Sequence, residues 1–475
     1  MSNLWDKSYN VLKCRDDHEP AFLYTEVKDG ANVLKLRDDC SWAKKGEEVK
    51  PQKIRKQIEP WLTALFQSEH LSLLTGSGLS QAVHILATGK PMQGMDNPQF
   101  TTLNTQIQDS AKYVANIAGR SEGNFEDRIR VANELLTGLD HLYRFVTEEN
   151  GTKQKNKETV ESLRRELKDI LKSFADAILS AESAIVSAKS FEKSMTVLIS
   201  FLMSFASRSG TRDRLQVFTT NYDRLIEAGS ELAGLHLVDR FVGSLMPIFR
   251  ASRLNLDMHY NPPGIRGEPR YLEGVVKYTK LHGSLDWIQS RDEIRRLGLP
   301  FGAASIEPFL EAIGDEKTTA HDIMIYPNSA KDRETAMYPY VELFRDFASA
   351  VCRPNSTVVT YGYGFGDEHV NRILRDMLTI PSTHLVVISY NDPLDRIQHY
   401  FENWGRKHQM TLLVGAHLGD LQSLVEHYLP KPAIDRTTLR MADLLRSRFG
   451  TEVQKHKEEA QGNEGEQDEH DSPEF

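Results

Sequence analysis

Three polar residues that follow short, mostly apolar segments could do chemistry together. Asn221 and Asp223 come shortly after residues 215–218, and His282 comes directly after residues 275–281. An amide and a carboxylate can orient sugar hydroxyls or a water molecule, and an imidazole can act as a general base near neutral pH. Each also has a structural alternative. Asn221 and Asp223 can form an Asx turn that caps the next helix, and His282 can be a hydrogen-bonded histidine without a catalytic role.

Two glycine-containing segments offer backbone N–H groups to a ligand. The first, Gly76-Ser77-Gly78, follows the apolar run 71–75, and a glycine turn that opens a helix favours a phosphate. Such turns are common, the third glycine of the dinucleotide fingerprint is missing, and no Lys-Ser/Thr pair indicates a P-loop NTPase. The second, residues 361–367, precedes a helical pattern, so Asp367 either binds a ligand or caps that helix.

The elements that carry these residues are short apolar runs. They occupy residues 71–75, 215–218, 275–281, 357–360, 385–388 and 411–414. Continuous runs of this kind, separated by helices or long connections, are typical of a parallel sheet covered on both faces. We therefore predict an α/β fold, with the candidate residues at the carboxyl ends of its strands, where ligands bind in such sheets.

Helical periodicity between residues 104 and 206 interrupts this pattern of strands. It is clearest at residues 129–146, 160–178 and 195–206, and it predicts an inserted helical subdomain. The predicted domains are an N-terminal extension at 1–50, an α/β domain at 51–103 and 207–432, the insertion at 104–206, and a C-terminal helix with a disordered acidic tail at 433–475.

The composition excludes several classes of protein. Residues 451–475 carry −7 of the net charge of −9, so the first 450 residues are nearly neutral and direct nucleic-acid binding is not expected. Three scattered cysteines argue against a disulfide scaffold and a Cys-based zinc module, and they fit a reducing compartment. No basic and apolar leader opens the sequence, and the longest apolar run is about half of the ~20 residues of a membrane span. We expect a cytoplasmic protein with no membrane segment.

The order of the segments resembles the sirtuin family. The glycine-alanine-glycine loop of sirtuins matches Gly76-Ser77-Gly78 with Ser80 at its serine position, their Asn-x-Asp motif matches Asn221-Tyr222-Asp223, and their His-Gly matches His282-Gly283. Prokaryotic sirtuin-like proteins of anti-phage defence are more similar still. They share Asn124-Phe125-Glu126-Asp127, Ile325-Tyr326-Pro327 with a following Lys331, and the block from Gly362 to His369. The resemblance covers about residues 70–430, without most of the helical insertion.

The resemblance implies a sirtuin-like, Rossmann-type sheet with a pocket for NAD+. In that pocket Gly76, Ser77 and Gly78 face the pyrophosphate, Asn221 and Asp223 orient the nicotinamide ribose and the nucleophile, and His282 is the base. Residues 389–391 lie near the adenosine ribose. The implied cofactor-binding residues are Gly76, Ser77, Gly78, Ser80, Gly362, Gly364, Phe365 and Asn391.

Departures from the sirtuin pattern favour hydrolysis of NAD+ to nicotinamide and ADP-ribose. Deacylase sirtuins carry a four-cysteine zinc module after their His-Gly motif, whereas only Cys352 follows here, so no zinc is expected. The phenylalanine-arginine pair of sirtuins is absent, and Met92-Gln93-Gly94 occupies that region. The sequence therefore does not assign the residue that shields nicotinamide. The alternatives are an NAD-dependent protein deacylase or ADP-ribosyltransferase, and a non-catalytic module that senses NAD or ADP-ribose.

An NAD hydrolase that is always active would kill its host, so assembly or a partner must control it. Stand-alone sirtuin-like chains of this kind often occur beside a HerA-type hexameric ATPase. From the resemblance we expect a homo-oligomer, a possible HerA-type partner, and a role in anti-phage defence by NAD depletion and abortive infection.

Overall fold

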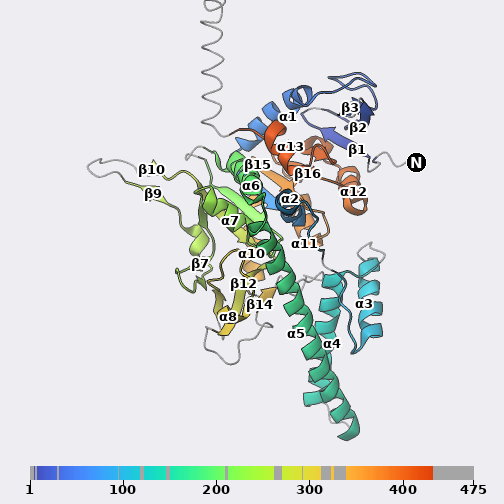
Figure 1. Cartoon of the computed structure of the whole chain (residues 1–475), viewed down its shortest axis with the longest axis vertical. Helices are drawn as coiled ribbons and strands as arrows, with labels where there is room; N and C mark the ends of the chain where they lie inside the picture. The colour runs from blue at the N-terminus through green and yellow to red at the C-terminus, as the bar shows by residue number, and fades with distance from the viewer. Residues whose placement is uncertain are drawn as a thin grey trace, which may run out of the picture. The chain divides into compact units, whose positions relative to one another are not determined.

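A ten-stranded sheet is the centre of the structure, with the order β3-β2-β1-β17-β16-β15-β4-β5-β11-β6 (Figure 1). The computed structural model describes residues 5, 8–15, 17–28, 31–94, 96–117, 122–145, 150–208, 212–261, 270–290, 293–311, 323–325 and 338–431. The strands are β1 (Tyr9–Lys13), β2 (Ala21–Lys28), β3 (Ala31–Leu36), β4 (His70–Thr75), β5 (Leu215–Thr219), β6 (His236–Val238), β11 (Val275–Lys280), β15 (Ser356–Tyr361), β16 (His384–Ser389) and β17 (Met410–Val414). From β17 to β6 the strands run parallel, and β1 to β3 extend the sheet antiparallel. The mixed α/β architecture confirms the predicted Rossmann-type fold class.

The strand register aligns the carboxyl ends of the central strands. Thr75 at the end of β4 pairs with Tyr361 of β15 on one side and with Thr219 of β5 on the other. Thr219 in turn pairs with Lys280 of β11. The turns after these strands therefore meet at one edge of the sheet.

The strand order reverses beside β4. After β4 the chain adds β5 and β11 on one side, and it later returns to add β15, β16 and β17 on the other. Such a reversal separates the two loops that leave neighbouring strands, which is why ligands bind at this point in open parallel sheets.

Helices cover both faces of the sheet. A hydrophobic cluster on one face includes residues of α1 (Pro51–Phe66), α2 (Ser77–Thr88), α6 (Phe191–Ala206) and α7 (Leu225–Leu232). The cluster on the other face includes residues of α10 (Tyr340–Val351), α11 (Glu368–Met377) and α12 (Arg396–Asn403). The helix predicted at 195–206 thus packs on the central sheet, because its residues Leu198, Phe201 and Phe205 are fully buried there.

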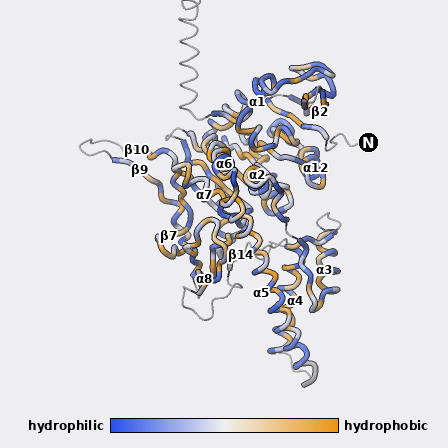
Figure 2. The backbone as a smooth tube through the Cα atoms, viewed as in Figure 1, coloured by the Kyte–Doolittle hydropathy of each residue, from blue (hydrophilic) through white to orange (hydrophobic). Residues whose placement is uncertain are grey.

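The helices α3 (Asn104–Ile117), α4 (Phe125–Phe145) and α5 (Asn150–Val186) share a separate hydrophobic cluster. Hydrophobic and hydrophilic residues alternate along α4 and α5, as expected for helices that bury one face (Figure 2). The cluster also includes Leu285 and Ile288 of a second sheet, so these helices pack against that sheet as well as against each other.

The second sheet has five strands in the order β14-β12-β13-β8-β7. Its strands are β7 (Phe241–Val242), β8 (Ile248–Phe249), β12 (Gly283–Ser290), β13 (Glu293–Arg296) and β14 (Ile323–Ile325); a two-stranded sheet pairs β9 (His259–Tyr260) with β10 (Arg270–Tyr271). The remaining elements are η1 (Arg253–Asn255), α8 (Glu307–Glu311), η3 (Pro393–Asp395), η4 (Lys407–Gln409), α13 (Leu421–Ser423) and η5 (Leu424–Tyr428).

Several sequence predictions lie outside the described residues. They are the segment Tyr326-Pro327 with Lys331, and the C-terminal helix and acidic tail predicted at 433–475. Among the helices in the described part of the chain, none is long and apolar enough to cross a membrane.

Candidate active site

A cavity of about 560 Å³ lies at the carboxyl ends of the central strands. Its volume is in the range of pockets that bind small molecules and cofactors. The predicted residues that line it are Gly76, Ser77, Gly78, Ser80, Asn221, Asp223, His282 and Gly364. Four separate loops supply these residues, and the strand register brings those loops together.

The glycine turn, residues 76–78, joins β4 to α2 and packs directly on the loop after β15. The N–H of Gly78 donates to the carbonyl of Gly362 at 3.0 Å, and a Cβ on Gly78 would lie 2.6 Å from the Cα of Gly362. No side chain larger than hydrogen fits between these two backbones. The turn therefore needs glycine for packing, and it also opens a 12-residue helix toward the cavity, where N–H groups favour an anion.

Asn221 lies between the glycine turn and the adjacent serine. Its Nδ2 donates to the carbonyl of Gly76 at 3.0 Å and to Ser80 Oγ at 2.8 Å, and Ser80 in turn donates to Asp223 Oδ2 at 2.6 Å. Both of these bonds use the side-chain nitrogen of Asn221, and Asn221 itself lines the cavity. Asp223 Oδ1 accepts from the N–H of Leu225 at 3.1 Å, so this carboxylate also forms the Asx turn at the start of α7.

His282 faces a carboxylate that belongs to the glycine loop, residues 362–367. Its Nε2 lies 2.7 Å from Asp367 Oδ2, and the two side chains are 7% and 6% exposed. Asp367 Oδ1 accepts from the N–H of His369 at 3.1 Å, and Asp367 is the N-cap of α11. The carboxylate therefore caps the helix, which was one of the two sequence alternatives, and it also contacts the imidazole of His282, which the sequence did not predict.

Three predicted cofactor-binding residues do not line the cavity. Gly362 packs its backbone against Gly78. Phe365 is 1% exposed, with its ring 4.9 Å from that of Tyr363 in the core on one face of the sheet. Asn391 is exposed, and its carbonyl accepts a hydrogen bond from Ser389 Oγ at 2.7 Å. These positions shape the loops around the cavity, and they do not reach into it.

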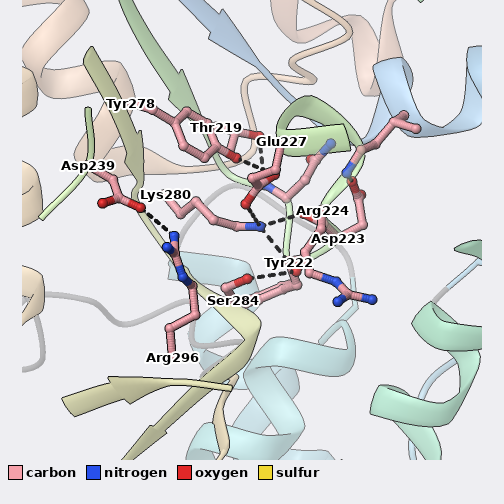
Figure 3. A network of polar contacts seen from close by, with 12 residues as sticks. Thr219, Tyr222, Asp223, Arg224, Glu227, Asp239, Tyr278, Lys280, Ser284 and Arg296 are labelled. Atoms are coloured by element: carbon pink, nitrogen blue, oxygen red, sulfur yellow. Dashed lines mark hydrogen bonds and ion pairs between the residues drawn. The ribbon is translucent and has the colours of Figure 1, made fainter. Parts of the chain in front are cut away.

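A buried charged network contacts the backbone of Tyr222 and Asp223, the two residues that follow Asn221 (Figure 3). Lys280, at the end of β11, donates from Nζ to the carbonyls of Tyr222 and Asp223 and forms an ion pair with Glu227 at 3.1 Å. Tyr278 OH donates to the other oxygen of Glu227 at 3.0 Å. Burial raises the pKa of Glu227, and the charge of Lys280 opposes that effect. This network holds in place the backbone of the loop that contains Asn221 and Asp223.

A second buried ion pair joins this loop to α5. Arg224 donates from its backbone N–H to Glu182 Oε1 at 2.8 Å, and its guanidinium contacts both oxygens of the same carboxylate. The guanidinium also donates to the carbonyls of Leu299 and Pro300. Burial raises the pKa of Glu182, while Arg224 lowers it. Arg224, which directly follows Asp223, thus connects this loop to helix α5 and to the segment after β13.

The helix α5 forms an apolar wall of the cavity that the sequence did not reveal. The wall consists of Phe174, Ala177, Ile178, Ala181 and Ile185, together with the carboxylate of Glu182. Their spacing of three to four residues is an ordinary helical core pattern, so nothing in the sequence separates them from other core residues. Other cavity residues that were not assigned to the site are Met92, Gln93, Gly94, Asn124, Glu126, Asp367 and Arg396.

The described residues contain no group of three or more His, Cys, Asp or Glu side chains arranged to hold a metal ion. The site is instead composed of backbone N–H groups, an amide, a serine and a histidine paired with a carboxylate. These groups fit an anionic, sugar-containing ligand that reacts by proton transfer.

The fold and this site define a Rossmann-type protein with its cavity at the strand reversal. Within this class, residues 215–409 match the sequence profile of the SIR2-like domain. The matched region contains Asn221, His282 and the glycine loop, and the glycine turn lies before it. No curated protein matches the chain. This part of the chain is therefore similar to SIR2-like domains, and domains of that kind use NAD+.

Proposed function

We propose that this chain is an NAD+ glycohydrolase, which cleaves the bond between nicotinamide and ribose and releases ADP-ribose. One observation carries the proposal: a single cavity holds the N-terminus of α2, the linked side chains of Asn221, Ser80 and Asp223, and the pair of His282 and Asp367. The first can bind phosphate, the second can hold ribose hydroxyls and water, and the third can accept a proton.

When the bond between nicotinamide and ribose breaks, nicotinamide departs with the bonding electron pair. The ribose is left with a positive charge. Water then adds to the anomeric carbon, and its proton passes to His282, with Asp367 stabilising the imidazolium that forms. In this proposal Asn221, which lines the cavity, orients the water or the ribose hydroxyls. Positioning provides much of the rate of such a reaction, because the reactants are already held in one cavity.

Water is the preferred nucleophile in this proposal because a helical insertion stands in for the peptide-docking module of deacylase sirtuins, and its helix α5 lines the cavity. Ile178 and Ala181 are part of the wall that α5 forms. The three cysteines of the sequence are too few for the four-cysteine module of deacylase sirtuins. Both observations favour hydrolysis over protein deacylation.

The proposed biological role is NAD depletion during phage infection, by a homo-oligomer that a HerA-type ATPase controls. This part rests on the sequence resemblance. Expression of the chain with and without a candidate ATPase in phage-challenged bacteria tests it, with cellular NAD+ as the readout. A loss of NAD+ that depends on infection supports the role, and constant NAD+ together with full phage growth contradicts it.

The enzymatic proposal is tested by incubating the purified full-length chain with NAD+ and measuring free nicotinamide, with and without the ATPase. We expect Asn221→Ala and His282→Ala each to lower nicotinamide release by roughly 10²- to 10⁴-fold, the usual contribution of a positioned acid–base group. If both variants retain wild-type activity, the site assignment is wrong.

Two further measurements separate the alternatives. Nicotinamide release that requires an added acyl-peptide would indicate a deacylase, and transfer of labelled ADP-ribose to protein would indicate an ADP-ribosyltransferase. Tight binding of NAD+ or ADP-ribose without any turnover would indicate a sensing module.

A further inference from the structure

The cavity has an unusual balance of charged side chains. Its described lining residues include four carboxylates, from Glu126, Glu182, Asp223 and Asp367, and a single arginine or lysine, Arg396. A dinucleotide brings further negative charge in its pyrophosphate. An anionic ligand would enter this cavity only if the carboxylates were neutralised and the cation lay near the phosphates.

Three of the four carboxylates have partners within the protein. Glu182 pairs with Arg224, and Asp367 contacts His282 and caps α11. Asp223 accepts hydrogen bonds from Ser80 and from the N–H of Leu225. These contacts reduce the negative potential that the walls present to a ligand, and Arg396 is the arginine among the described lining residues.

Arg396 lies over the glycine loop. It is the first residue of α12, and its Nη1 donates to the carbonyl of Gly364 at 3.3 Å. A Cβ on Gly366 would lie 2.9 Å from the same nitrogen, so the guanidinium lies directly against the loop at this residue. The arginine thus covers the middle of the loop, at residues 364–366.

The two ends of the same loop contact the other parts of the site. Gly362 at one end packs on Gly78 of the glycine turn, and Asp367 at the other end contacts His282. Arg396 therefore lies between the N-terminus of α2 and the histidine along this loop. A dinucleotide that extended from His282 to the glycine turn would follow this loop, and Arg396 lines the same cavity.

We propose that Arg396 binds the pyrophosphate of a dinucleotide and sets the preference of the cavity for phosphate-containing substrates. The inference rests on the proposed function in that it assumes a dinucleotide in this cavity. The planar guanidinium suits the task because it presents several N–H donors to phosphate oxygens at once and stays charged at any physiological pH. Arg396 thus acts on substrate binding, and the bond-breaking step belongs to His282 and Asn221.

The test compares ligands that differ only in their phosphates. ADP-ribose and adenosine are titrated into the full-length chain by calorimetry, for the wild type, Arg396→Gln and Arg396→Lys. Arg406→Gln, at an exposed arginine beyond the end of α12, is the matched control. We expect Arg396→Gln to weaken ADP-ribose binding by roughly 10- to 100-fold, the loss that accompanies removal of hydrogen bonds to a charged group, with a smaller loss for lysine. Adenosine binding should not change in any variant.

Turnover gives a second readout. For NAD+, Arg396→Gln should raise KM with little change in kcat, and for nicotinamide riboside, which has no phosphate, it should change neither. Equal weakening of ADP-ribose and adenosine would overturn the inference, and so would an ADP-ribose affinity within twofold of the wild type. Thermal unfolding of each variant reports whether the chain is folded.

The outcomes also separate this inference from the proposed function. A wild-type chain that binds ADP-ribose through Arg396 but releases no nicotinamide would refute the hydrolase and support the phosphate site. A chain that hydrolyses NAD+ equally well with Arg396→Gln would support the hydrolase and refute the phosphate site. A wild-type chain that binds no ADP-ribose at millimolar concentration would refute both.

Discussion

The two walls of the cavity are built in different ways. The wall from the sheet consists of turns after β4, β5, β11 and β15, in which small and polar residues such as Ser80 and Asn221 hydrogen-bond to one another. The wall from α5 is apolar apart from Glu182, whose carboxylate is bound by Arg224. The sheet wall holds the groups that can do chemistry, and the helix wall encloses them.

This difference indicates how the two walls respond to mutation. Under the proposed function, a change in the sheet wall alters proton transfer or ligand contacts directly, because the groups proposed to react lie in that wall. A change in the helix wall alters how far the cavity is enclosed. It also affects the ion pair between Glu182 of the wall and Arg224, which directly follows Asp223. The predictions below test this division, beginning with the largest expected effect.

The largest effect should come from the carboxylate behind His282. Asp367→Asn keeps an N-cap for α11, since asparagine caps helices as well as aspartate, but it removes the charge that stabilises a protonated imidazole. We expect nicotinamide release to fall roughly 10²-fold or more with little loss of thermal stability. Asp420→Asn, at the N-cap of α13, is the control and should leave activity unchanged. Wild-type activity in Asp367→Asn would show that the histidine works without this partner.

The next effect should come from the connection between the walls. Arg224→Met leaves Glu182 buried without its partner, which should lower the free energy of unfolding by about 3–5 kcal/mol in urea titrations. Replacing both residues by methionine should restore much of this stability, because the unpaired charge is gone. A single-variant loss below about 1 kcal/mol would show that the pair does not hold the helix wall in place.

The pH dependence of the Arg224→Met variant follows from the direction of the Glu182 shift. Burial raises the pKa of this carboxyl in the folded protein above its ordinary value of 4.5, and removal of Arg224 takes away the opposing effect. A raised pKa means that the folded state binds the proton more tightly, so stability is lost as pH rises through and above that ordinary value. The destabilisation should therefore be larger at pH 8 than at pH 5, and an unchanged difference would contradict this account.

A smaller effect is expected where the glycine turn packs on the glycine loop. Gly362→Ala places a methyl group 2.6 Å from the Cα of Gly78 at a φ of +61°, which should cost about 2–3 kcal/mol of stability and weaken ADP-ribose binding. Gly89→Ala is the matched control, because Gly89 has a φ of +73° but no atom within 4 Å of an added Cβ. It should cost about 1 kcal/mol and leave binding unchanged. Equal costs for the two variants would remove the argument for close packing.

The smallest effect should come from an exposed ion pair of α5, between Lys172 and Glu307 at 2.7 Å. Hydrogen bonds from Lys172 and Ser305 lower the pKa of Glu307 from 4.5 to about 2. A lowered pKa gives stability that is present above pH 4.5 and is lost as pH falls toward 2. Glu307→Gln should therefore cost less than about 1 kcal/mol at pH 7, since exposed pairs contribute little, and nothing at pH 2. A cost equal to that of Arg224→Met would contradict the contrast between buried and exposed pairs.

Much of the sheet could be predicted because its strands are continuous apolar runs. The strands β4, β5, β11, β15, β16 and β17 all lie within a residue or two of the predicted segments. The second sheet was not predicted, because strands such as β7 and β8 have only two residues each. The sequence also gave no sign that β1 to β3 join the edge strand β17, since that pairing spans the whole chain.

The candidate site divides in the same way. Asn221, Asp223 and His282 could be proposed because each follows a strand, and the structure brings them into one cavity. The contact of His282 with Asp367 and that of Glu182 with Arg224 could not, because 85 and 42 residues separate the partners and each has an ordinary local role. Pairing across such distances is set by the tertiary fold.

The close approach of Gly78 to Gly362 has a consequence for judging related sequences. Because these glycines are required for two loops to pack, a descendant that had lost all catalysis would still need them in order to fold. Their presence therefore identifies a shared architecture and carries no information about turnover. Under the proposed function, an active member would be recognised instead by a histidine after the strand that corresponds to β11 together with an acidic residue at the start of the helix that corresponds to α11.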